Sequence, residues 1–300
     1  MGDDVLMTQG KQIRLINPGG MYSHVVARSA VAIARHLDEF QWGNVGSEGS
    51  FNVHFFREQK DAVTKEERIG RDFYISHGWF QKFVGKWPVQ LNAFSHIGVP
   101  GPMLRDFLLS QGHAAEKLHV IGHPGMDDTI SGRINPDVVS EKPIVVLALS
   151  HSSYLGSWTS IADKVGQRIR LIAEVIDTPH PARGFRLARD ILQVASVCVS
   201  DWSGTIFEAW SLGVPVVFPT WARNNRPAWK WPGSPIARIY DEGVGYHCEA
   251  ANEFPKMIER AIHEGITKAE TQFIDDYFPI ELRGQSGKAA AGEIEKAAGG

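Results

Sequence analysis

Several features that mark well-known protein classes are missing from this chain. It has only two cysteines, Cys198 and Cys248, too few for a disulfide framework and typical of a reduced intracellular protein. The longest unbroken apolar run, 144–149, is much too short to span a bilayer. The N-terminal segment MGDDVLMTQGKQ is acidic and lacks an apolar core, so no secretion signal is predicted. We therefore expect a cytoplasmic protein without a membrane span.

Motifs of several common nucleotide and metal sites are also absent. No Gly-x-Gly-x-x-Gly follows the first predicted strand, which argues against a dinucleotide-binding domain. The segment GQSGKA lacks the spacing and the hydroxyl residue of a P-loop, and neither cysteine has neighbours at zinc-site spacing. The acidic pattern Asp-x-Asp, which would hold a divalent cation, does not occur. We therefore expect no metal site and no required cofactor.

What is present is an ordinary globular composition with a regular strand and helix pattern. Hydrophobic residues make up 43% of the 300 residues and charged residues 22%, with a net charge of -3. A nucleic-acid partner would therefore need a local basic patch. Short apolar strands alternate with amphipathic helices along the chain, and this alternation is typical of parallel α/β sheets.

The length and one polar stretch predict two domains. Residues 131–142 contain Gly132, Pro136 and few apolar residues, and the strand and helix cycle restarts after them. We expect two Rossmann-like, doubly wound α/β domains that face each other across a cleft. The predicted parts are an acceptor-side domain (1–135), a donor-side domain (136–282) and a C-terminal helix or tail (283–300). Ligands of such sheets bind at the carboxyl ends of the strands, where the polar turns of this sequence fall.

The most informative turn is in the segment VSDWSGTIFEAWSLGVPVVFP, residues 199–219. A strand ends there and a helix begins near Thr205, whose free N–H groups favour an anion such as phosphate. Ser203 and Thr205 offer hydroxyls and Gly204 admits an anion close to the backbone. Glu208, about one turn further on, can accept hydrogen bonds from a ribose diol. The alternative is plain N-capping with a glutamate on the helix face.

This segment resembles the donor-binding segment of GT-B transferases, and among these the CDP-glycerol glycerophosphotransferase family in particular. Further segments resemble that family in the same order between about residues 70 and 290. ISHGWFQKF is similar to its His-Gly-Thr-Pro-Leu-Lys segment, VIGHPGMDD to its Gly-Tyr-Pro-Arg-Asn-Asp turn, DTPHP to its strand-end His-Pro, and LRGQSGKAA to its Asp-Gly-Lys-Ala-Ser segment. The chain departs from the pattern at residues 79–81 and 123–125, and Glu208 stands where the family more often has Asp.

The resemblance implies roles for two histidines. His77 corresponds to the family's proposed base, and an imidazole with a pKa near 6.5 suits removal of a proton from an acceptor hydroxyl. With His77 we place Asp201 in the catalytic group. His180, on a stiff Pro-His-Pro turn, is expected to contact the donor diphosphate, with Arg183 adding charge. Purely structural histidines remain the alternative at both positions.

Three further segments are candidates for substrate contacts. Ser152, in the first loop of the second domain, is predicted to bind donor phosphate, or to lie in a solvated turn. Gly19 and Gly20 let a phosphate approach the backbone, or form an ordinary tight turn. Residues 220–231 interleave tryptophans with Arg and Lys, which suits stacking on bases or sugars or, alternatively, a packed lid. The acceptor-side predictions are Gly19, Gly20, Lys82, Arg226 and Trp229.

We therefore predict a transferase that moves a glycosyl or glycerophosphate group from a CDP- or UDP-linked donor to an acceptor hydroxyl. Ser200 occupies the position where retaining GT-B enzymes have a first glutamate, so an inverting or phosphotransfer mechanism is favoured. The acceptor is a polyol or glycan polymer, or alternatively DNA with hydroxylated bases. A nucleotide-sugar epimerase of the same architecture and a non-catalytic sugar- or nucleotide-binding module stay open.

Overall fold

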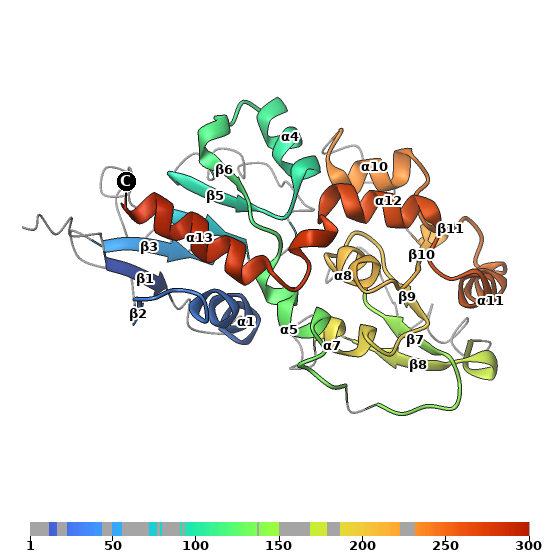
Figure 1. The fold of residues 1–300 in the computed structure, drawn as a ribbon. Coiled ribbons are helices and arrows are strands. Elements are labelled where there is room, and N and C mark those ends of the chain that lie inside the picture. The colour runs from blue at the N-terminus through green and yellow to red at the C-terminus, as the bar shows by residue number, and fades with distance from the viewer. Residues whose placement is uncertain are drawn as a thin grey trace, which may run out of the picture.

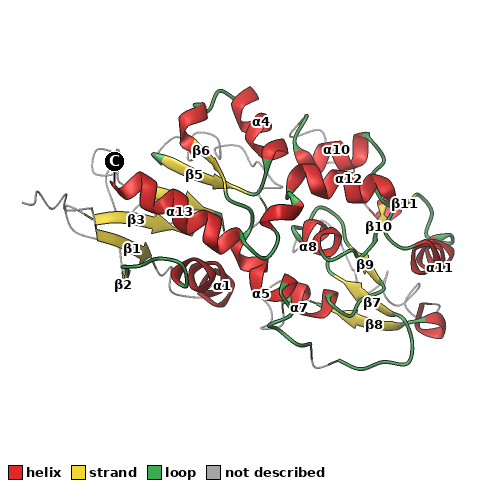
Figure 2. Cartoon of the chain, in the orientation of Figure 1, coloured by secondary structure: helices red, strands yellow, loops and turns green. Residues whose placement is uncertain are grey.

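A computed structural model describes most of the chain. The described residues are 12–16, 23–43, 50–55, 72–76, 79, 91, 94–136, 138–149, 169–178, 187–222 and 232–299. They form two parallel sheets flanked by helices (Figures 1 and 2). None of the described helices has both the length and the apolar character needed to cross a bilayer.

The first sheet contains six parallel strands in the order β2-β1-β3-β4-β5-β6. They are β1 (Gln12–Ile16), β2 (Gln41–Gly43), β3 (Ser50–His54), β4 (Asp72–Ile75), β5 (His96–Val99) and β6 (Leu118–Val120). The helical elements of this half are α1 (Ser23–Ala34), α4 (Pro102–Ser110), η3 (Ala115–Lys117), η4 (Pro124–Met126) and α5 (Asp127–Ile130). β3 and β4 are buried along their whole length, although polar residues (Ser50, Asn52, His54 and Asp72) stand among their apolar ones.

The second sheet contains five parallel strands in the order β11-β10-β9-β7-β8. They are β7 (Ile144–Leu147), β8 (Glu174–Asp177), β9 (Val197–Val199), β10 (Val216–Pro219) and β11 (Tyr246–Cys248). Its helical elements are α7 (Ala188–Leu192), α8 (Thr205–Ser211), η6 (Thr220–Ala222), α10 (Pro235–Asp241), α11 (Phe254–Glu264), α12 (Lys268–Tyr277) and η7 (Ile280–Leu282). The strand order reverses between β7 and β9, so the carboxyl ends of these two strands flank the expected ligand crevice.

The C-terminal helix α13 (Ser286–Gly299) returns to the first sheet (Figure 1). Its buried Ala290, Ala291 and Ile294 belong to the same apolar cluster as Leu15 and Val53 of the first sheet. Near its start, α13 lies so close to α1 that a Cβ on Gly287 would be 2.4 Å from the backbone oxygen of Ala32. The tail predicted for 283–300 is thus a helix packed on the N-terminal half.

Several predicted elements differ in detail from the structure. The strand predicted at 170–176 begins only at Glu174, because 169–172 is helical. Within the helix predicted at 185–195, the described α-helix spans Ala188–Leu192. The strands β2 and β5 and the helices α10 and α12 were not predicted. The domain boundaries at residues 135 and 282 stay predictions.

A buried aspartate holds the start of α13. Asp127 is 3% exposed and accepts hydrogen bonds from the backbone N–H groups of Ser286, at 3.1 Å, and Gly287, at 2.6 Å. These N–H groups have no partner within the helix, so the carboxylate satisfies them. Burial nevertheless raises the pKa of Asp127 to about 6, and the two backbone hydrogen bonds oppose this rise.

The raised pKa of Asp127 predicts a pH-dependent stability. Between the usual value of 3.8 and about 6, the folded protein binds this proton more tightly than the unfolded chain does. The free energy of unfolding should therefore fall by about 3 kcal/mol as the pH rises through this range, and this contribution should be constant above it. Asp127→Asn cannot titrate. Denaturant unfolding of both proteins at several pH values should show the wild type losing about 3 kcal/mol relative to Asp127→Asn as the pH rises from about 4 to about 6; a difference that is constant with pH would contradict the assignment.

Candidate nucleotide site

The structure describes five of the predicted site residues, all on the corner between β9 and α8. These are Asp201, Ser203, Gly204, Thr205 and Glu208. The other predicted site residues lie outside the described residues: Gly19, Gly20, His77, Lys82, Ser152, His180, Arg183, Arg226 and Trp229. The site can therefore be built from the corner and from the described side chains that contact it.

The corner lies at the point where the second sheet reverses its strand order. Directly after β9, the Ser200 hydroxyl donates a hydrogen bond to the backbone oxygen of Ala148, 2.9 Å away, next to the end of β7. α8 begins at Thr205, as predicted. Ser203, Gly204 and Thr205 are all partly exposed, so their hydroxyls and backbone can be reached from solvent. A phosphate-sized anion could thus be bound at this edge of the sheet.

The capping pattern differs from the predicted one. Gly204 occupies the N-cap position and provides no side-chain cap. The Ser203 hydroxyl accepts the Thr205 N–H at 3.1 Å and donates to the Thr205 hydroxyl oxygen at 2.8 Å. The Thr205 N–H, one of the first-turn donors of α8, therefore already has an acceptor within the corner. Ser203 and Thr205 are both partly exposed residues.

Asp201, predicted to belong to the catalytic group, is completely buried. Its backbone oxygen accepts a hydrogen bond from the Tyr240 hydroxyl at 2.6 Å, which ties the corner to α10. The carboxylate of Asp201 is thus enclosed by protein in this structure, and its catalytic role stays a prediction.

Glu208 is held by two buried side chains that the sequence analysis did not assign to the site. Its Oε1 lies 3.3 Å from Nε of Arg189 and 3.4 Å from the indole nitrogen of Trp79, which donates to it. Glu208 is 7% exposed and Arg189 is 5% exposed. Glu208 therefore lies in a buried ion pair, and its contact with a ribose stays a prediction.

Trp79 joins the two halves of the chain at this point. It follows β4 of the first sheet, and its ring stacks on His123 at 4.2 Å and on Phe207 of α8 at 5.8 Å between centroids. The Tyr277 hydroxyl of α12 donates to the Trp79 backbone oxygen. The residue that replaces threonine of the family's His-Gly-Thr segment therefore fills the junction between the halves.

The segments resembling the family's Gly-Tyr-Pro-Arg turn also meet α7. Nη1 of Arg189 donates to the backbone oxygen of Gly125 in η4, 2.8 Å away. A Cβ on Gly125 would lie 2.8 Å from the same Nη1, so only glycine allows this approach. The next residue of α7, Asp190, forms a two-pronged ion pair with Arg28 of α1 at 2.5 and 2.7 Å. Consecutive residues of α7 thus bind two elements of the first half.

The basic, tryptophan-rich segment contributes one described ring. Trp221 packs edge-on against Phe254 of α11, with 6.2 Å between ring centroids, and belongs to the apolar cluster of the second sheet. Trp221 thus packs within its own half, and the two interpretations of the rest of the segment stay predictions. Among the described residues, no group of His, Cys, Asp or Glu side chains has an arrangement that could hold a metal ion.

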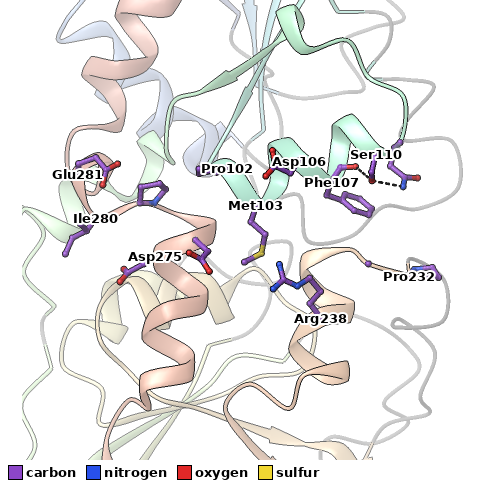
Figure 3. A pocket seen from close by; sticks show the side chains of 14 residues that line it. Pro102, Met103, Asp106, Phe107, Ser110, Pro232, Arg238, Asp275, Ile280 and Glu281 are labelled. Atoms are coloured by element: carbon purple, nitrogen blue, oxygen red, sulfur yellow. Dashed lines mark hydrogen bonds between the residues drawn. The ribbon is translucent and has the colours of Figure 1, made fainter.

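A separate cavity of about 690 Å³ lies between α4 of the first half and α10 and α12 of the second (Figure 3). Met103 and Phe107 of α4 line one side and Arg238 and Asp275 the other. Among the described residues that line it, none is a predicted site residue. Arg238 and Asp275 are engaged with Glu242 and Arg283, at 2.5 and 2.6 Å respectively.

No protein-family model and no curated protein sequence matches this chain. Solved structures do match it along nearly its whole length. A variant of the wall teichoic acid polymerase TagF, in a structure with CDPG, is 11% identical and gives a TM-score of 0.64 over 96% of this chain and 88% of that one. The chain has the GT-B fold. This confirms the predicted fold class.

An epimerase and a further UDP-bound protein match as well. The UDP-GlcNAc 2-epimerase from Methanocaldococcus jannaschii is 12% identical, with a TM-score of 0.55 over 94% of this chain and 99% of that one. MnaA of S. aureus, in a structure with UDP, is 12% identical, with a TM-score of 0.58 over 90% of this chain and 92% of that one. These GT-B neighbours comprise enzymes of two reaction types.

Proposed function

We propose that this GT-B chain is an enzyme that transfers a glycosyl or glycerophosphate group from a CDP- or UDP-linked donor to an acceptor hydroxyl. The observation that carries the proposal is the corner after β9, at the strand-order reversal. It combines the partly exposed Ser203, Gly204 and Thr205 with Glu208, whose carboxylate is already oriented by protein groups. The structures with CDPG and with UDP among the fold neighbours support a nucleotide ligand.

In this proposal the corner binds the donor and the first half presents the acceptor. Ser203, Thr205 and the Gly204 backbone bind the diphosphate together with His180, Arg183 and Ser152, while Glu208 accepts hydrogen bonds from the ribose. Gly19, Gly20, Lys82, Arg226 and Trp229 stay acceptor-side proposals. A polyol or glycan acceptor agrees with the resemblance, and a DNA acceptor receives no support from the one described tryptophan of 220–231.

The chemistry is an in-line displacement. The acceptor oxygen forms a bond to the glycosyl carbon or to phosphorus as the bond to the leaving group breaks, and His77 takes the hydroxyl proton. The leaving group gains negative charge, which His180, Arg183 and the hydroxyls of the corner stabilise. Glycerophosphate transfer from CDP-glycerol releases CMP, whereas glycosyl transfer from a UDP-sugar releases UDP. The released nucleotide therefore identifies the bond that breaks.

Epimerisation of a nucleotide sugar is the second candidate, because a UDP-GlcNAc 2-epimerase matches the fold. This reaction converts the donor without an acceptor. Incubation of the protein with UDP-GlcNAc alone distinguishes the cases: a new epimer without any added acceptor indicates an epimerase, and a requirement for an acceptor indicates a transferase.

Thermal unfolding with CDP-glycerol, UDP-sugars, GDP-sugars and free nucleotides tests the donor site directly. A ligand present at 100 times its dissociation constant should add about 2.7 kcal/mol of stability. We expect stabilisation by one nucleotide class, and a loss of this effect in a Ser203→Ala, Thr205→Val double variant. The exposed Ser110→Ala serves as the control, because its hydroxyl bonds only to α4 and to Gln111. No stabilisation of the wild-type protein by any of these ligands would overturn the proposal.

A further inference from the structure

We propose that Arg189 is a positioning residue that orients Glu208 toward the ribose of the nucleotide donor, and that it does so only while the two halves are docked. The inference rests on the proposed function and adds a residue to it. Arg189 lies on α7, distant in the sequence from the corner, and no motif of the sequence marks it. Its partners Glu208 and Gly125 come from two separate segments, α8 and η4.

The first step concerns the two carboxylate oxygens of Glu208, which have different neighbours. Arg189 and the Trp79 indole both approach Oε1, at 3.3 and 3.4 Å. Oε2 accepts no hydrogen bond from the described side chains or backbone, and it does not belong to the fully buried polar atoms that lack a partner. One oxygen is therefore occupied by the protein, and the other is left to accept a ligand hydroxyl.

The second step is the chemistry of a buried arginine. The guanidinium is planar and permanently charged, so it can bind two acceptors at once in a fixed geometry. Here Nη1 donates to the Gly125 backbone oxygen at 2.8 Å, while Nε lies 3.3 Å from Glu208 Oε1 as a charged contact without hydrogen-bond geometry. Without Arg189, the Glu208 carboxylate would lose its only cation within 4.0 Å among the described residues. It would then take up a proton or turn toward solvent.

The third step connects the two halves. Gly125 belongs to η4 of the first half, whereas α7 and α8 belong to the second (Figure 1). A Cβ on Gly125 would lie 2.8 Å from Nη1 of Arg189, so the guanidinium would have to shift from its present position. Separation of the halves would remove both the Gly125 oxygen and Trp79 from the neighbourhood of Glu208. The geometry of the ribose contact thus depends on the docked arrangement.

The experiment compares nucleotide affinities by calorimetry for the wild type and for Arg189→Met. The ligands are CDP and UDP, each with its 2′-deoxy and 3′-deoxy counterpart. The wild type should bind the ribonucleotide more tightly than a deoxy counterpart by about tenfold or more, since a hydrogen bond to a charged group is lost. In Arg189→Met this ratio should fall toward one, because Glu208 is no longer oriented.

Arg28→Met is the matched control. It removes the neighbouring ion pair between α1 and α7 without touching Glu208, so it should retain the wild-type ratio. Arg189→Lys keeps the positive charge but lacks the planar guanidinium, so it should give an intermediate ratio of ribonucleotide to deoxynucleotide affinity. It provides the test if Arg189→Met does not fold. Gly125→Ala displaces Arg189 without changing its chemistry and should reproduce the loss.

The outcomes separate the two proposals. An unchanged ribose-to-deoxyribose ratio in Arg189→Met, or an equal fall in Arg28→Met, would overturn the positioning role and leave the proposed function standing. If neither CDP nor UDP binds to the wild-type protein, both the function and this inference are overturned.

Discussion

Replacement of His77 by alanine is expected to lower kcat for group transfer by about 100- to 10,000-fold. The physical reason is that the acceptor hydroxyl must lose its proton as it attacks, and alanine cannot accept one. The affinity for the nucleotide should change little, because the donor is bound by the corner after β9. Steady-state kinetics with the donor identified by thermal unfolding measures kcat, and calorimetry measures nucleotide binding.

Two controls make this result specific. His263→Ala changes an exposed histidine of α11 and should leave both kcat and nucleotide affinity unaltered. The pH profile provides the second control: kcat/KM of the wild type should fall at low pH as the base becomes protonated, and the residual activity of His77→Ala should lack this limb. Full turnover by His77→Ala would show that the base is another residue.

The fold class could be predicted because strands and helices alternate along the chain, and this pattern stays recognisable even though some single elements were missed. Buried parallel strands are continuous apolar runs, and Ile144–Leu147 and Val216–Pro219 are both easily recognised. His96–Val99 escaped prediction because its four residues include a histidine and a glycine, and neighbouring strands supply its burial. The helix Lys268–Tyr277 carried a usable signal, the Thr267 and Glu270 of a capping box.

The corner of the candidate site was predictable because its chemistry is local. Asp, Ser, Gly and Thr are preferred in turns and at helix N-termini, and this preference does not depend on the rest of the chain. The environment of Glu208 could not be predicted, because Arg189 and Trp79 contact it only through tertiary packing. A glutamate that seemed to be a free ligand contact proved to be half of a buried ion pair.

A second buried glutamate should have the largest effect on stability. Glu270, in the first turn of α12, is completely buried. Its Oε1 accepts hydrogen bonds from the Trp210 indole at 2.7 Å and the Val216 backbone N–H at 2.9 Å. Its Oε2 accepts the Thr267 N–H at 2.7 Å. A single carboxylate thus connects α12 to α8 and to β10, and burial raises its pKa while these donors oppose the rise.

Glu270→Ala should lower the free energy of unfolding by about 3 kcal/mol or more, because three buried donors lose their acceptor at about 1 kcal/mol or more each. Glu270→Gln keeps the volume but turns an NH₂ group toward one of these donors, so we expect a smaller loss. Glu264→Ala, at an exposed ion pair on the neighbouring helix, is the matched control and should unfold almost like the wild type. Denaturant unfolding measures all three. Equal stability of Glu270→Ala and Glu264→Ala would mean that water replaces the lost carboxylate, and that α12 is not held to β10 through this side chain.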